Sequence, residues 1–262
     1  MIKIIVTVFL LFSIIVCFAS ENDTIYQGRL GLLVGTDIGG AVPFPPKNIP
    51  GKINAYPQIN ANIGAKFSFS LIKQWGLGAE LNYKTIEMEA DARVTNQKFQ
   101  MDDDVNMYFT GTTTMDMKFT MLEVPLYAKY HFKDKKNIVF AGFYYSYIFS
   151  GKFVADPQKG FSGPVPDMAE ITDMSTIKME FTSFLTNWDW GYLLGYERRI
   201  FDRFALTLRF SMGLKDIFKS SSNYFDYSML HMRGSITVSY DLFKTKSLFG
   251  NKRSSHIANQ PI

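Results

Sequence analysis

Alternation of apolar and polar residues is the dominant pattern of the chain beyond its first twenty residues. In the segment 204–214, Phe, Leu and Met hold the even positions, while Ala, Thr, Arg, Ser and Gly hold the odd ones. Successive side chains of a strand point to opposite faces, so this period of two predicts a strand with one apolar face. Eight segments show the pattern: about 26–35, 59–69, 75–84, 122–132, 138–153, 188–200, 204–214 and 230–242.

The connections between these segments alternate in length. Those at 70–74, 133–136 and 201–203 are short, those at 36–57, 90–114 and 155–187 are long, and the one at 215–228 is intermediate. Outer-membrane barrels have short periplasmic turns and longer external loops. The chain is therefore predicted to be all-β, an eight-stranded antiparallel transmembrane β-barrel in up-and-down order, with both termini on the periplasmic side.

The apolar face is expected to point outward into lipid. An eight-stranded barrel has an interior only just wide enough for ordinary side chains, and the apolar face is rich in Phe, Tyr and Trp. A soluble barrel with that face around a ligand is the alternative. Seven aromatic residues near the short turns or the end of the last strand predict a ring at the periplasmic interface: Phe69, Trp75, Tyr130, Phe132, Tyr196, Phe204 and Tyr240.

The opposite face then becomes the lumen, and it carries charges of both signs. Buried charges need partners, so a salt-bridged plug that conducts poorly is expected. The predicted network consists of Arg29, Lys66, Lys84, Lys129, Arg199, Arg209 and Arg233 with Glu80, Glu123, Asp189, Glu197 and Asp241.

The first residues form a separate unit. Lys3 precedes an apolar run over 4–18, and small residues allow a cut between Ala19 and Ser20, which together predict a secretory signal peptide at 1–19. An N-terminal anchor and a lipoprotein signal at Cys17 are the alternatives. The barrel would occupy 20–243, and 244–262 would form a polar, basic periplasmic tail. Loss of Cys17 with the signal leaves a chain without thiols or disulfides.

Composition narrows the class of protein. Aromatic residues make up 16% of the chain and charged residues 20%. A mean hydropathy of −0.03 argues against a bundle of transmembrane helices, since each would need about 20 apolar residues in a row. The net charge of +4 and the absence of a basic cluster argue against nucleic-acid binding.

No catalytic, metal or cofactor site is predicted, and the chain is not expected to be an enzyme. His131 and His231 fall on the lumen face, and His256 lies in the tail. His231 and Ser235 are four residues apart on one strand, about 13 Å, which is too far for a nucleophile and its base. The run 102–104 consists of three Asp residues, but a solvated acidic turn is favoured over a calcium site.

Three segments resemble a known family. Residues 122–130 resemble the LEIPLLLKY strand of the porin-family, PorT-like β-barrel domain of Bacteroidetes outer membranes. Residues 189–197 resemble its DFGLVLGAGYE strand, and 204–217 its LEARYSYGLTNI strand, with Arg209 and Gly213 retained. The resemblance spans 28–243 and implies an outer-membrane barrel without an assigned activity. Pro125, unusual in a paired strand, is expected at a bulge or near the rim.

The predicted function is structural or interactive: a monomer in outer-membrane lipid of a Gram-negative cell, with long external loops that contact a protein or surface ligand. A small porin and a PorT-like accessory barrel of a secretion system, with the tail 244–262 as its inner contact, are the alternatives. A lipid-modifying enzyme is the least favoured hypothesis.

Overall fold

A computed structural model describes residues 28–45, 51–72, 74–100, 106–134, 136–166, 179–219, 225 and 227–245. The strands are β1 (Gly28–Phe44), β2 (Gly51–Pro57), β3 (Asn60–Ile72), β4 (Trp75–Gln100), β5 (Asn106–His131), β6 (Asn137–Gly163), β7 (Met179–Glu180), β8 (Trp188–Arg199), β9 (Phe204–Asp216) and β10 (Ser228–Thr245). A short 3-10 helix, η3, covers Thr182–Phe184. No helix within these ranges is long and apolar enough to cross a membrane.

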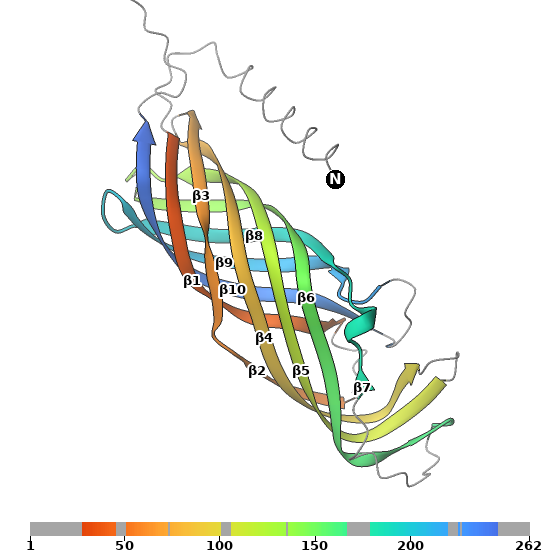
Figure 1. The fold of residues 1–262 in the computed structure, drawn as a ribbon. Coiled ribbons are helices and arrows are strands. Elements are labelled where there is room, and N and C mark those ends of the chain that lie inside the picture. Colours follow the sequence, from red (N-terminus) through yellow and green to blue (C-terminus); the bar gives the residue numbers. More distant parts are fainter. Residues whose placement is uncertain are drawn as a thin grey trace, which may run out of the picture.

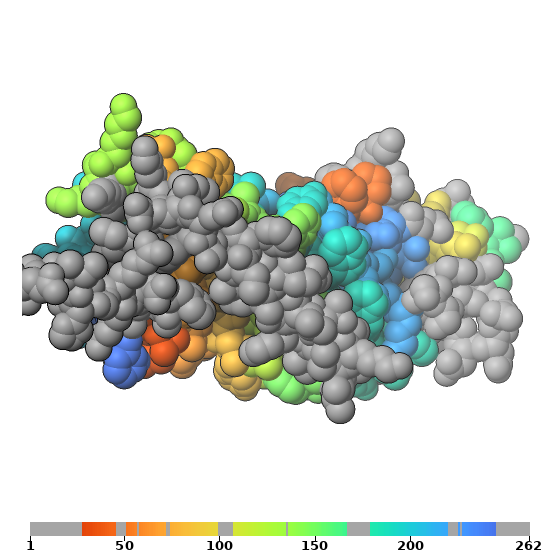
Figure 2. Space-filling view, turned by 90° about the horizontal axis from the view of Figure 1, so that it is seen from above, coloured from red at the N-terminus to blue at the C-terminus, as the bar shows by residue number. Residues whose placement is uncertain are grey.

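Eight of the strands close into an antiparallel ring in the order β1, β3, β4, β5, β6, β8, β9 and β10. The ring is closed because β10 pairs with β1 along its whole length, from Gly28 opposite Thr245 to Phe44 opposite Ser228. Blue, red and orange residues accordingly lie side by side along the lower left edge of Figure 2. β2 pairs with β4, and β7 pairs with β6. The predicted eight-stranded, up-and-down barrel is confirmed.

Three strands are far longer than the ring requires. β4, β5 and β6 have 26, 26 and 27 residues, whereas β8 and β9 have 12 and 13. Together with β2 they project beyond the ring at the end opposite the short turns (Figure 1). We call this projecting sheet, residues 51–57, 85–100, 106–120 and 150–163, the extension. The ring end that carries the short turns, residues 132–134, 136–137 and 200–203, is called the turn end.

The extension corrects the sequence prediction, which ended the strands too early and assigned 36–57, 90–114 and 155–187 to loops. Strand structure occupies most of the described residues of 36–57 and 90–114, and residues 155–163 and 179–180 of the third segment. The reason is an inversion of polarity. On β4 the outward residues Leu81 and Tyr83 are about half exposed and inward Lys84 is buried, whereas two residues later Ile86 is buried and Glu87 faces outward. The alternation continues, but its apolar face changes sides.

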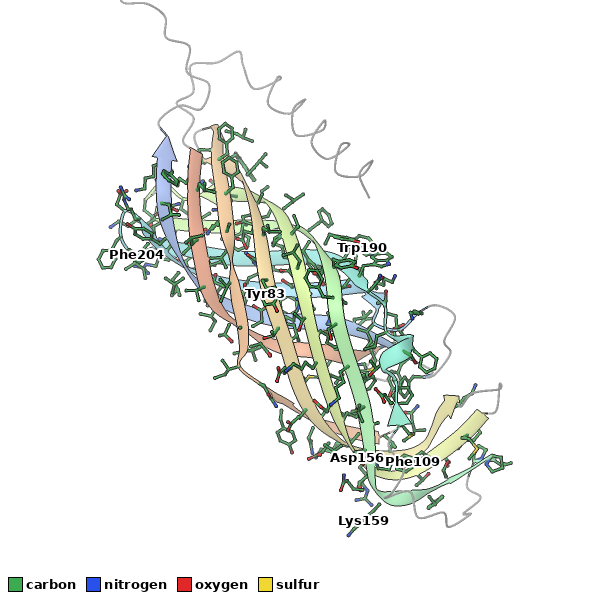
Figure 3. The ribbon with its side chains drawn as sticks, viewed as in Figure 1. Tyr83, Phe109, Asp156, Lys159, Trp190 and Phe204 are labelled. Carbon is green, nitrogen blue, oxygen red and sulfur yellow. The ribbon has the colours of Figure 1, made fainter. Side chains whose placement is uncertain are left out.

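Two groups of aromatic residues bound the part of the wall that is apolar outside. At the turn end, the ring centroid of Tyr130 lies 5.1 Å from that of Trp75 and 5.6 Å from that of Phe132. Toward the extension, Tyr145 stacks on Trp188 at 6.2 Å. Figure 3 shows Phe204 at the turn end and Trp190 on the opposite side of this band. Two aromatic girdles on either side of an apolar band are typical of membrane barrels.

Pro125 lies inside β5, away from the rim, which corrects the expectation of a bulge or a rim position. It is buried and pairs with Tyr144 of β6. On its other side the ladder to β4 passes from Leu126–Ala79 to Glu123–Asn82 without a pair at Pro125 and without a register shift there. The barrel therefore accepts a proline, which has no N–H to donate, by omitting bridges to one neighbour.

Several predictions concern residues outside the described ranges. They are the signal peptide 1–19 with its cut between Ala19 and Ser20, the three Asp residues at 102–104, His256, and the tail beyond Thr245. These remain predictions.

Candidate functional site

All twelve predicted lumen charges lie on the inner face of the ring. Ten are buried, and Arg29 and Arg199 are partly exposed at the turn end. Eleven of them, all but Asp189, fall into three layers along the barrel axis, since the strands that carry them are paired in register. The sequence predicted these positions because a strand's period of two fixes which residues share a face.

The first layer lies at the mouth of the lumen, at the turn end. Oε2 of Glu197 accepts from Lys66 Nζ at 2.6 Å and from Lys129 Nζ at 3.0 Å. Oδ2 of Asp241 lies 2.8 Å from Arg29 Nη1 and 3.0 Å from Arg199 Nη1. Arg199 also lies 3.6 Å from the free oxygen of Glu197 and so links the two carboxylates.

The middle layer is built on Glu80. Arg209 Nη2 lies 2.6 Å from both carboxylate oxygens, and the Tyr127 hydroxyl donates to Oε1 at 2.6 Å. The guanidinium also lies 5.8 Å from the ring centroid of Tyr127 and 5.7 Å from that of Phe140. Gly78 makes room for this layer, because a Cβ there would sit 2.2 Å from Cε2 of Tyr127.

The third layer joins four charges. Lys84 Nζ lies 2.9 Å from Asp37 Oδ2 and 2.7 Å from Glu123 Oε1, and Arg233 Nη2 lies 2.8 Å from Glu123 Oε2. Sequence reasoning missed Asp37, because it ended the first strand at Gly35. The signal was present: Asp37 continues the odd-numbered series that places Arg29 on the lumen face.

Asp189 behaves differently from the other carboxylates of the network. The Tyr144 hydroxyl donates to its Oδ2 at 2.7 Å, and its Oδ1 has no hydrogen-bond partner in the described part of the chain. The carboxylate also lies against Gly213, where a Cβ would come 3.0 Å from Oδ1. Asp189 is thus hydrogen-bonded to a phenol and is not salt-bridged to any described cation.

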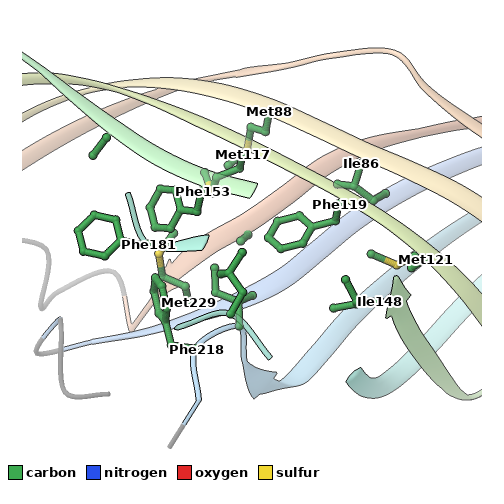
Figure 4. Close-up of a cluster of buried hydrophobic side chains, with 14 residues drawn as sticks. Ile86, Met88, Met117, Phe119, Met121, Ile148, Phe153, Phe181, Phe218 and Met229 are labelled. Carbon is green, nitrogen blue, oxygen red and sulfur yellow. The ribbon is translucent and has the colours of Figure 1, made fainter. Parts of the chain in front are cut away.

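Above the charges, an apolar cluster crosses the barrel (Figure 4). We call it the apolar cap: Ala41, Ile86, Met88, Met117, Phe119, Met121, Ile148, Phe153, Ala155, Phe181, Leu185, Ile217, Phe218 and Met229. Many of these come from inward positions of the extension, and the remainder include residues of the two segments that follow β7 and β9. Sequence reasoning missed the cap, since its residues become neighbours only in the folded chain.

The cap is fastened by backbone hydrogen bonds between segments far apart in sequence. Phe181 N donates to Phe153 O at 2.9 Å, and Thr186 N donates to Ile217 O at 2.7 Å. The Phe153 ring centroid lies 5.4 Å from that of Phe181 and 5.7 Å from that of Phe218. The cap therefore has the aromatic packing and the satisfied backbone of a protein core.

His231 lies where the charged lumen meets the cap. Its side chain is buried, its ring meets Phe119 edge-on at 4.9 Å, and neither ring nitrogen has a hydrogen-bond partner among the described residues. The hydroxyl of Ser235 has no described partner either, so no hydrogen bond joins it to His231. Within the described ranges, no three His, Cys, Asp or Glu side chains gather as a metal site would require.

Comparisons with known proteins address the family and the fold. A family model described as "Outer membrane protein beta-barrel domain" matches residues 21–219. The solved structures that match include Ail of Yersinia pestis in complex with the heparin analogue sucrose octasulfate, at 8% identity and a TM-score of 0.38 over 83% of this chain and 99% of that one. OprG of Pseudomonas aeruginosa is similar at 13% identity and a TM-score of 0.34, over 85% and 96%. No curated protein matches.

Proposed function

Because the chain belongs to the outer membrane protein beta-barrel domain family, and so to the outer membrane, we propose that it is a closed barrel that works through its extension. The extension would contact a protein or surface ligand outside the cell. The observation that carries the proposal is the apolar cap that covers a set of buried lumen charges, most of which are ion-paired. In this proposal the protein is a monomer and is not an enzyme.

The inversion of polarity supports the placement of the extension in water. Within the ring, lipid-facing positions such as Leu126 and Leu208 are apolar and about two-fifths exposed. Beyond it, the outward face carries ion pairs between exposed side chains, among them Lys152 with Asp116 at 3.0 Å and Lys118 with Glu87. Exposed charges belong in water, and apolar bands about 25 Å tall belong in lipid. The turn end and both termini would then be periplasmic.

The closed lumen follows from two layers in series. An ion that entered from the turn end would have to separate charge pairs whose side chains are buried, such as Lys84 with Glu123. It would next have to cross the apolar cap, whose side chains cannot replace its hydration shell. Either barrier alone opposes conduction, and small barrels have little lumen to spare.

A small porin remains the alternative that a specific observation favours. Several buried lumen atoms have no hydrogen-bond partner among described residues, including Arg209 Nε and Ser211 Oγ. Buried polar atoms of this kind usually bind ordered water, which points to a hydrated lumen below the cap. A PorT-like accessory barrel of a secretion system also remains a proposal, based on the resemblance and the basic tail.

Cysteine labelling tests the orientation. The sequence has a single Cys, within the predicted signal peptide, so Thr112→Cys in the extension and Lys133→Cys in a short turn would each be the sole thiol of the mature chain. On intact cells, a membrane-impermeant maleimide should label Thr112→Cys and leave Lys133→Cys unlabelled until the outer membrane is permeabilised. The reverse result would overturn the orientation.

Liposome swelling tests the function of the lumen. Liposomes that contain the purified protein should swell in isosmotic arabinose no faster than protein-free liposomes, whereas liposomes with a known porin should swell rapidly. Swelling that rises in proportion to the amount of this protein would favour the small porin.

A further inference from the structure

Among the described residues, the mouth of the lumen at the turn end carries more positive than negative charge. The ion pairs of Lys66, Lys129 and Arg199 are made to two carboxylates, those of Glu197 and Asp241, and Arg29 also lies 2.8 Å from Asp241. Even with Arg29 set aside, three cations share two carboxylates. The excess of positive charge in the first layer therefore does not depend on the interactions of Arg29.

The deeper layers have no such excess. Arg209 faces Glu80 one to one, and Lys84 with Arg233 faces Asp37 with Glu123, two to two. Asp189 has no ion pair within the described ranges, but it lies eight residues from Glu197 on the same strand, about 26 Å away. At that distance it cannot neutralise the mouth. The imbalance is local.

The two lysines at the mouth are the least favourable part of this arrangement. Their Nζ atoms contact the same oxygen, Glu197 Oε2, at 2.6 and 3.0 Å, so the two ammonium groups are held within a few ångström of each other. The side chain of Lys66 is 6% exposed and that of Lys129 is 1% exposed. An uncompensated charge in such a place is costly, unless a further anion is bound.

Access to this cluster is from the turn end. Arg29 and Arg199 are more exposed than the lysines, at 19% and 11% of their side chains. A guanidinium offers a planar fork of donors that suits carboxylate and phosphate oxygens, and a lysine offers three donors of which the carboxylate uses one. The buried lysines and the accessible arginines thus form the floor and the rim of one anion site.

We propose that the turn-end mouth of the lumen binds an oxyanion, a phosphate or a carboxylate, between Arg199, Lys66 and Lys129. Free inorganic phosphate, a phospholipid headgroup and an acidic peptide share this chemistry. Inorganic phosphate is the smallest of them and is the probe for the site itself. The inference concerns the periplasm-facing end and is independent of the partner proposed for the extension.

The test uses the purified full chain in a zwitterionic detergent, with phosphate titrated against chloride at constant ionic strength and pH 7. Phosphate should raise the unfolding temperature in a saturable manner, as expected for a ligand that binds the folded state. Arg199→Gln should weaken the apparent affinity about tenfold or more, the loss expected for one charged hydrogen bond. Arg203→Gln is the matched control, an exposed arginine of the adjacent turn.

Absence of a saturable shift with phosphate, with acetate and with a glutamate-rich peptide would overturn the site. An equal loss in Arg203→Gln and Arg199→Gln would show a general response to surface charge and would also overturn it. If Arg199→Gln fails to fold, Lys66→Gln carries the same prediction. A stronger response to vesicles with phosphatidylglycerol than to free phosphate would identify a lipid headgroup as the occupant.

Discussion

Nζ of Lys84 lies 2.7 Å from Oε1 of Glu123, and neither side chain has any exposed surface. The pair marks a boundary within the barrel. In the ladder between β4 and β5, Lys84 is opposite Met121, a residue of the apolar cap, and Ile86 is the next inward residue of β4. Along β4, the inner face therefore changes from the charged lumen to the apolar core between Lys84 and Ile86.

This position predicts how the pair contributes to stability. Lys84→Met leaves Asp37 and Glu123 without a cation that contacts both. Removal of one partner of a buried pair lowers the free energy of unfolding by about 3–5 kcal/mol. The double variant Lys84→Met/Glu123→Leu should lose less than the sum of the single losses. Urea unfolding in detergent, followed by tryptophan fluorescence, measures both values.

Lys118→Met is the matched control, since Lys118 also pairs with a glutamate but is exposed on the extension. It should unfold close to the wild-type urea concentration, because exposed ion pairs contribute little. Equal losses in the Lys84 and Lys118 variants would contradict the burial of the lumen pair.

The inversion of polarity makes a prediction about the lipid boundary. On β5, Leu126 faces outward within the apolar band and Thr112 faces outward on the extension. Leu126→Arg should destabilise the folded protein in lipid by about 2–4 kcal/mol, the cost of an arginine near the bilayer midplane. Thr112→Arg should be nearly neutral in the same unfolding assay. A large cost at Thr112 would place the extension in lipid and would contradict the boundary.

Gly78 and Tyr127 provide a test of packing in the lumen. Gly78→Ala would place a methyl group on the Tyr127 ring and displace the hydroxyl from Glu80, at a cost of about 1–3 kcal/mol. Addition of Tyr127→Leu should restore much of that loss, since the smaller side chain leaves room. Thermal unfolding of the two single variants and the double variant checks this. Strictly additive losses would show that the two residues do not compete for space.

A surface pair at the turn end makes a prediction about pH. Lys244 hydrogen-bonds to Asp202 and lowers the pKa of its carboxyl below the ordinary value of 3.8. The contribution of Asp202 to stability is therefore complete above pH 3.8 and is lost as the pH falls through the lower folded value. NMR titration should find the Asp202 carboxyl below its ordinary range, and Lys244→Ala should return it there. An unchanged titration in Lys244→Ala would contradict the pairing.

Much of the ring could be predicted from the sequence, because the period of two fixes both the strand and the face. Residues such as Arg209 and Glu80 were assigned to the lumen by this rule, and the structure brings them within 2.6 Å of each other. The rule does not say which lumen residues are partners, since that depends on the register and tilt of strands distant in sequence.

The extension and the cap were beyond the same reasoning for two physical reasons. The first is that residues 85–94 keep the period of two, but their apolar side chains lie on the inner face instead of the outer one. A search for an outward apolar face therefore ends at the membrane boundary. The second is that Phe181, Leu185 and Phe218 come from segments without alternation. Their place in the core depends on long-range contacts such as the bridge between Leu185 and Phe218.

The closed lumen is the central claim, and single-channel recording tests it most directly. Purified wild-type protein inserted into a planar bilayer should give no steady conductance at either polarity, because buried ion pairs and the apolar cap block the lumen in series. A reproducible open level with each insertion, one that scales with salt concentration as an aqueous pore would, would contradict the closed barrel.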